Sequence, residues 1–277
     1  METTVATTAS QGGLWGGGNQ PLRASYGKMM MWFFIVSDAL TFSGFLAAYG
    51  FSRFKFVDAW PIADEVFTHF PFLHGVPAPM FYVAFMTFIL IFSSVTMVLA
   101  VDAGHKMKQS KVAIYMFLTI IGGAIFVGSQ AWEWATFIKG DYGAVETKGG
   151  KILQFLDTEG NRVAIGSFAE SMQITATEQE PSNGIWFMSG NDQTSYNFEE
   201  VKAGFLANDN LLIRTQYLDE NGHPTVLSRE ASVAKIQKDG KLVVEGANLK
   251  RNEYGHPLFA DFFFFITGFH LSLIHIS

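Results

Sequence analysis

Two carboxylic acids lie within long apolar stretches of this sequence. Asp38 is the only charged residue between Lys28 and Arg53, and Glu133 is the only one in the run 112–138. An ionisable side chain at membrane depth is costly, so it usually faces a bundle interior or water. Asp38 could therefore handle protons or contact lipid, but it could equally be a neutral, hydrogen-bonded residue that packs helices. The residues alone favour neither interpretation.

Other polar residues in these stretches have a spacing typical of helix packing. Gln130 and Glu133 are three residues apart, so they share one face of a helix. Trp132 and Trp134 flank the acid as residues of an interfacial aromatic belt would. We interpret Gln130 and Glu133 as a structural polar cluster that holds neighbouring helices together. Hydroxyl groups in the preceding apolar run are expected to form interhelical hydrogen bonds rather than to catalyse a reaction: Ser93, Ser94 and Thr96.

The histidine and cysteine content argues against a metal site. The sequence has seven histidines and no cysteine, which excludes disulfides, thiolate ligands and cysteine nucleophiles. Haem iron needs axial side-chain ligands, most often histidine, held by the protein. His69, His74 and His105 fall in expected loops, and only His270 lies in an apolar run. We therefore predict no catalytic residue, no metal ligand and no redox cofactor in this chain.

The elements that would position these residues are membrane-spanning helices. Charged residues make up only 16% of the 277 residues, against about 25% in soluble domains. Three apolar runs, at about 29–52, 80–101 and 112–138, are each long enough to cross a hydrocarbon core of about 30 Å. A fourth run begins at 258. The predicted fold is an all-α polytopic membrane bundle, with three complete transmembrane helices and the start of a fourth.

A polar segment, 140–257, interrupts the apolar runs. It shows three hairpin-like patterns and one short helical pattern, and we expect a small β-rich domain. The first pattern places extended segments on either side of a turn at 157–161, the second places a turn at 219–222 after the segment 211–218, and the third joins 232–236 to 241–245 through 239–240. The helix is expected at 198–205.

Charge indicates which side of the membrane each segment occupies. The loop 104–111 carries three lysines and no acid, which predicts a cytoplasmic position. The tail 1–27 is then flexible and cytoplasmic, and the insertion 140–257 is extracytoplasmic. Between 141 and 258 there are 17 acidic and 11 basic residues. This acidic domain could dock a basic partner or simply be solvated. Neither region is basic enough to bind nucleic acid.

Four short segments, taken together, resemble a known pattern. They read Met-Trp-Phe-Phe-Ile-Val-Ser-Asp-Ala at 31–39, Ser-Ser-Val-Thr-Met at 93–97, Gly-Ser-Gln-Ala-Trp-Glu-Trp at 128–134 and Phe-Phe-Phe-Ile-Thr-Gly-Phe-His at 263–270. In this order they resemble subunit III of the haem-copper (cytochrome c) oxidases. Asp38 stands where that family usually has a membrane-buried Glu, and Gln130, Glu133 and His270 align without substitution.

The resemblance implies a function without chemistry of its own. It implies a non-catalytic subunit III of an aa3-type cytochrome c oxidase in the bacterial inner membrane, which stabilises subunit I and supports proton uptake. Haem and copper would belong to the partner subunits I and II, and phospholipid would bind to this chain. The insertion, far longer than the family's usual loop, could contact cytochrome c or another respiratory complex.

Two alternatives and one departure from the pattern accompany this interpretation. The same fold could serve a quinol oxidase or act as a nitric-oxide-reductase accessory protein. A small proton-coupled transporter, with Asp38 and Glu133 as coupling carboxyls, is more distant because the sequence shows no internal repeat.

The last residues, 271–277, read Leu-Ser-Leu-Ile-His-Ile-Ser, which resembles a transposase adapter translated in frame, and we expect them to be non-native.

Overall fold

The computed structural model describes residues 25–68, 70–71, 80–169, 196–220 and 223–276. The flexible tail expected over 1–27 therefore falls almost entirely outside the described residues. The chain divides into two units, one ending at Phe51 and one from Ser52 to Ser277. Helix α1 (Tyr26–Lys55) makes up the described part of the first unit and continues a few residues into the second.

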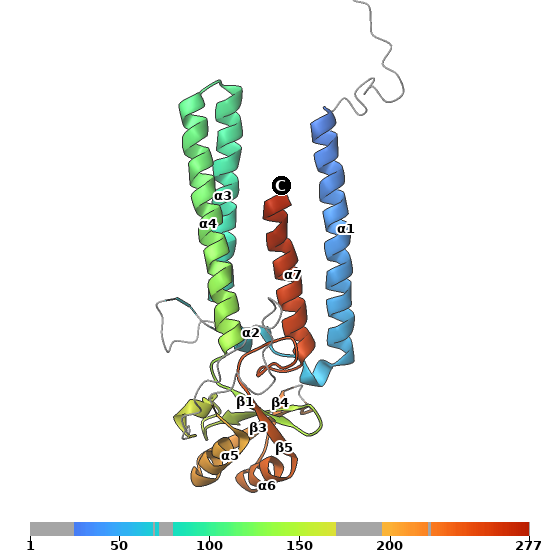
Figure 1. Cartoon of the computed structure of the whole chain (residues 1–277), viewed down its shortest axis with the longest axis vertical. Coiled ribbons are helices and arrows are strands. Elements are labelled where there is room, and N and C mark those ends of the chain that lie inside the picture. The colour runs from blue at the N-terminus through green and yellow to red at the C-terminus, as the bar shows by residue number, and fades with distance from the viewer. Residues whose placement is uncertain (1–24, 69, 72–79, 170–195, 221–222, 277) are drawn as a thin grey trace, which may run out of the picture. The chain divides into compact units, whose positions relative to one another are not determined.

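Two long helices of the second unit form an antiparallel pair (Figure 1). They are α3 (Phe81–His105) and α4 (Gln109–Lys139), joined by a connection of three residues. Within the described ranges, α1, α3 and α4 are the helices long and apolar enough to cross a membrane, as the sequence predicted. Helix α7 (Pro257–Ile276) follows the polar segment and has a shorter apolar stretch.

Small and hydroxyl-bearing residues bring α3 and α4 close together. A Cβ atom at Gly122 would lie 3.1 Å from the Cβ of Ser93, so the two backbones approach closely there. The Thr96 and Thr119 hydroxyls share a hydrogen bond of 2.7 Å across the interface. Most long apolar side chains of both helices point outward instead, and Phe88 is 69% exposed. Such an exposed apolar surface would be unfavourable in water and favourable in lipid.

The polar segment contains a five-stranded antiparallel sheet, which confirms the predicted small antiparallel sheet. Its strand order is β4-β3-β2-β1-β5. The strands are β1 (Ala144–Thr147), β2 (Ile152–Leu156), β3 (Leu212–Leu218), β4 (Pro224–Val226) and β5 (Gly240–Val244). Val145 pairs with Leu153 and Val243, and Phe155 pairs with Ile213. The turn after β2 is closed by the Asp157 carboxylate, which accepts hydrogen bonds from the Glu159 and Asn161 amides.

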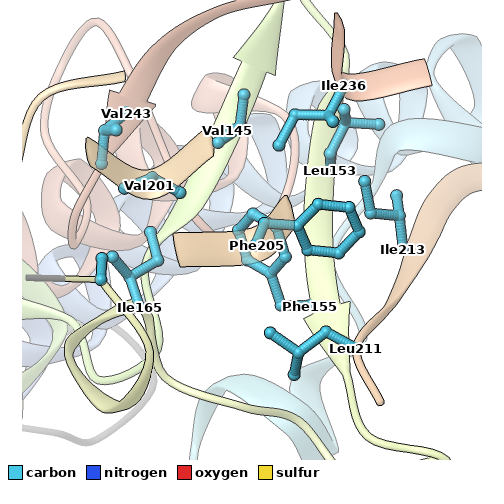
Figure 2. Close-up of a cluster of buried hydrophobic side chains, with 11 residues drawn as sticks. Val145, Leu153, Phe155, Ile165, Val201, Phe205, Leu211, Ile213, Ile236 and Val243 are labelled. Carbon is cyan, nitrogen blue, oxygen red and sulfur yellow. The ribbon is translucent and has the colours of Figure 1, made fainter. Parts of the chain in front are cut away.

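Two helices cover one face of this sheet and enclose its core (Figure 2). Helix α5 (Phe198–Ala207) confirms the short helix expected at 198–205, and it begins with a capping box between Asn197 and Glu200. Helix α6 (Arg229–Asp239) follows β4. Figure 2 shows Phe155 of the sheet and Phe205 of α5 meeting at the centre, with their ring centroids 5.5 Å apart.

Helix α6 corrects one expectation from the sequence. The segment 232–236 was predicted as a strand, but it lies inside α6, so the 239–240 turn joins a helix to β5. The Ser228 side chain accepts a hydrogen bond from the Ala231 amide and caps the helix. Ser232 and Ile236, four residues apart, are both fully buried against the sheet. Alternating and helical patterns overlap over so few residues, and burial of one helical face decided between them.

Candidate functional site

Glu133 and Gln130 meet as a buried pair on the last turns of α4. Gln130 Nε2 donates a hydrogen bond of 3.0 Å to Glu133 Oε2. Gln130 is 6% exposed and Glu133 is 8% exposed. The i, i+3 spacing brings them together, as expected from their shared helix face. A buried carboxyl with an amide donor therefore lies near the end of α4 that leads into the sheet.

A small cavity lies against the Glu133 side chain. Its volume is about 20 Å³, which is room for about one water molecule. It is partly open and is lined by residues in or next to α2 (Ala63–Val66), in α3 and α4, and in the segment before α7: Val66, Phe67, Tyr82, Trp132, Glu133, Thr136, Phe137 and Tyr254. The Tyr82 hydroxyl lies 3.4 Å from the Ser129 carbonyl oxygen, to which it donates. The cavity is thus mainly aromatic, with a few polar groups at its edge.

Aromatic contacts hold α7 against this end of α4. The Trp134 indole N–H donates to the Thr267 hydroxyl over 3.1 Å. A Cβ atom at Gly268 would lie 3.2 Å from the Trp134 ring, which explains a small residue there. Phe137 packs against Phe263 with ring centroids 5.1 Å apart. Trp134 and Thr267 are 133 residues apart in the sequence, so only the folded insertion brings them together.

The other predicted polar residues lie elsewhere. The Ser93 hydroxyl donates to the Thr119 carbonyl over 3.4 Å, and Thr96 contacts the Thr119 hydroxyl, in the middle of the α3–α4 pair. Ser94 is exposed on the opposite side of α3. His270 lies on α7, one turn beyond Thr267, with an exposed side chain. The predicted set is therefore divided among three places, and the sequence did not indicate Thr119, Trp134 or Thr267 as partners.

Asp38 lies in the middle of α1 and is half-buried. Neighbouring hydroxyls bond within the helix itself, with Ser37 donating to the Phe34 carbonyl and Thr41 to the Ser37 carbonyl. No group of three or more His, Cys, Asp or Glu residues that could hold a metal ion occurs among the residues that the structure describes.

A second buried carboxylate, Glu253, joins the sheet domain to the helices. It is fully buried. Its two oxygens accept four hydrogen bonds from main-chain amides: Asp141 N (3.1 Å), Tyr142 N (3.3 Å), Gly143 N (3.1 Å) and Gly246 N (2.6 Å). Gly143 and Gly246 have positive φ angles, which turn their amides toward the carboxylate. This junction connects the residues after α4 to the segment that leads into α7. No local sequence pattern predicted it.

Charged and polar groups on the second face of the sheet extend this junction. Arg214 of β3 forms a two-pronged ion pair with Glu65 of α2, with Nη1 donating to Oε1 over 3.0 Å. Its Nε donates to Gln154 Oε1 over 2.9 Å, and Gln154 in turn donates to the Glu253 carbonyl. The Arg162 guanidinium lies over the Tyr142 ring, 4.3 Å from its centroid, and burial lowers the pKa of Arg162.

His256 packs among aromatic side chains beside the start of α7. Its ring stacks on Phe56 with centroids 4.0 Å apart, and it also faces Trp60. Its Nδ1 accepts a hydrogen bond from the Leu258 amide at the start of α7. Burial of the ring lowers the pKa of His256, because removal from water disfavours the charged imidazolium.

This lowered pKa predicts a pH dependence of stability. The folded state binds fewer protons than the unfolded state, in which histidine has a pKa of about 6.5. The contribution of His256 is therefore complete above that value and is lost as the pH falls toward the lower folded pKa. His256→Phe keeps the stack, so we expect its melting temperature to fall less steeply than that of the wild type over this window. Thermal unfolding of both proteins in parallel buffers measures their melting temperatures. Identical slopes of melting temperature against pH would contradict the lowered pKa of His256.

Comparison with known proteins adds no relative to these observations. No family model, no curated protein and no solved structure matches this chain.

Proposed function

We propose that this chain is a multi-pass membrane protein and a non-catalytic subunit, similar to subunit III, of an aa3-type cytochrome c oxidase. In this proposal α1, α3 and α4 cross the bacterial inner membrane and α7 enters it. The N-terminus is cytoplasmic, because Lys106, Lys108 and Lys111 lie at the α3–α4 turn, and the sheet domain is periplasmic. The chain stabilises subunit I and supports proton uptake during oxygen reduction.

One observation carries this proposal. Segments that resemble subunit III, at 128–134 and 263–270, are separated by the insertion, yet their residues are in direct contact. Trp134 bonds to Thr267 and packs on Gly268, and Gln130 bonds to Glu133. The segment at 93–97 likewise contacts α4 through Ser93 and Thr96. Two of the matching segments, 128–134 and 263–270, therefore pack on each other, and a third, 93–97, packs on the same helix α4, as expected if they belong to one bundle.

The exposed surfaces of the helices suit lipid and a larger partner. Apolar side chains cover the outward faces of α3 and α4. We propose that subunits I and II of the oxidase and phospholipid cover these faces. Haem and copper belong to those partner subunits in this proposal, and the periplasmic sheet domain is available to cytochrome c or another respiratory complex.

Affinity purification of this chain from native membranes tests the assignment. The proposal expects subunits I and II to copurify by mass spectrometry and the visible spectrum to show haem a. A quinol oxidase or nitric-oxide reductase as the copurifying enzyme would move the chain to that accessory role. A colourless chain without such partners would contradict the oxidase assignment and favour a transporter.

Asp38→Asn tests the membrane-buried acid within that complex. The amide keeps the size and hydrogen-bonding capacity of the side chain but cannot bind or release a proton at neutral pH. We expect slower proton uptake or a shorter catalytic lifetime at an unchanged haem content. Oxygen consumption followed through many turnovers measures both, with Thr41→Val on the same helix as the control. Unchanged turnover and lifetime would reduce Asp38 to a packing residue.

A further inference from the structure

One oxygen of the Glu133 carboxyl accepts a hydrogen bond, and the other is able to accept one. Oε2 accepts from Gln130, whereas Oε1 receives no hydrogen bond from the part of the chain that the structure describes. Oε1 is not among the fully buried polar atoms that lack a partner, so it keeps some accessible surface and a water molecule can reach it and donate a hydrogen bond to it. The side chain also lines the 20 Å³ cavity described above, which is large enough for about one water molecule.

The surroundings of this cavity can hold a water and carry no competing charge. Thr136 and Tyr82 add hydroxyl oxygens to its lining, and both already donate to main-chain carbonyls, which leaves their oxygens able to accept. The other titratable side chains that line it are Tyr82 from α3 and Tyr254 from the segment before α7, and burial raises the pKa of Tyr254. The α2 side contributes only Val66 and the Phe67 that follows it.

The position of the cavity places it close to the polar domain. Glu133 lies six residues before Lys139, the end of α4, or about 9 Å along the helix axis. Tyr254 lines the same cavity and follows Glu253, the junction residue of the sheet domain. A proton on Glu133 thus has a short distance to cover to the aqueous side on which the insertion lies.

We propose that Glu133 holds one internal water at Oε1 and exchanges its proton through that water with the aqueous phase on the insertion side. In the exchange the carboxyl O–H bond breaks, the water oxygen takes the proton and passes it on, and the carboxylate remains hydrogen-bonded to Gln130. This site rests on the proposed function, because it requires α4 to lie in the membrane. It assigns to Glu133 a role in proton exchange beyond the helix packing expected from the sequence.

Infrared difference spectroscopy on the purified complex in lipid nanodiscs tests this proposal. Spectra recorded as the pH is lowered should show a protonated carboxyl band that Glu133→Gln removes. Transfer to heavy water should shift that band rapidly in the wild type. Glu200→Gln, which changes another buried glutamate far from the cavity, should leave the band in place. A band that persists in Glu133→Gln, that is absent at every pH, or that does not exchange would overturn the proposal.

Two cavity variants separate a hydrated carboxyl from a dry one. Val66→Leu adds a methylene to the lining and should exclude the water, which slows the deuterium shift severalfold while the band remains. Thr136→Val keeps the volume and removes a hydroxyl, so it serves if Val66→Leu does not fold. Unchanged deuterium exchange in the folded variant would contradict the proposed internal water.

Carbonate extraction separately tests whether the chain lies in the membrane. A haem-free complex that still shows deuterium exchange at Glu133 would refute only the oxidase assignment.

Discussion

Glu253→Gln should lower the free energy of unfolding of the sheet domain by about 3 kcal/mol or more. The carboxylate is fully buried and accepts four main-chain hydrogen bonds. A hydrogen bond to a charged group contributes about 1.5–3 kcal/mol, and a buried donor left without an acceptor costs about 1–3 kcal/mol. The glutamine amide also directs its own N–H groups at main-chain N–H donors. Hydrogen-exchange mass spectrometry should show faster exchange at Asp141–Gly143 and Gly246.

Glu199→Gln is the matched control for this prediction. Its side chain is 74% exposed on α5 and pairs with Lys202, so the change should cost less than about 0.5 kcal/mol. The control domain should keep its protection at the junction amides. Equal protection in the Glu253→Gln protein would mean that the carboxylate is not what holds the α4 exit to the sheet.

Gly246→Ala should have an effect at least as large, on the order of 4 kcal/mol or more, and could prevent folding of the insertion. Gly246 has a φ angle of +66°, which disfavours any side chain. A Cβ atom there would also overlap the Ile138 carbonyl oxygen and lie 2.7 Å from the Ile138 carbonyl carbon. These are main-chain atoms in the last turn of α4, so they cannot move aside without breaking the helix end. Thermal unfolding and yield of folded protein measure the effect.

Gly150→Ala separates the backbone cost from the overlap. Its φ angle is +75°, but nothing lies within 4 Å of the position that a Cβ atom would take. We expect it to cost only about 1–2 kcal/mol, the ordinary penalty for a side chain in a left-handed conformation. If both alanine variants lose the same stability, close packing of Gly246 on α4 is not the cause, and the junction is looser than the structure indicates.

Glu253→Gln and Gly246→Ala share a consequence for function. The junction connects the last turn of α4, which carries Glu133, to the segment that leads into α7. A partner that binds the sheet domain would therefore act on the same end of α4 as the proposed proton-exchange site. Variants at Glu253 and Gly246 should consequently disturb the Trp134–Thr267 contact even though neither residue touches it.

Local patterns in the sequence were sufficient for several elements. Long apolar runs with at most one charged residue predicted α1, α3 and α4, because a helix that is apolar on nearly all sides needs no information from distant residues. The turn at Asp157 and the short helix α5 were equally local, since each depends on hydrogen bonds within four residues. The segment of α6 was misjudged because its alternation over five residues suits both a strand and one face of a helix.

The tertiary structure alone decided the partners of the polar side chains. Glu253 contacts amides about 110 residues earlier, Trp134 meets Thr267 across the whole insertion, and Thr119 faces Thr96 on another helix. No periodicity records such pairs, because they depend on how the sheet domain closes between α4 and α7. The sequence by itself determined which segments are apolar helices and where acids interrupt them. Whether each acid lies beside a cavity, an amide nest or an exposed helix face depends on packing between residues that are far apart in the chain.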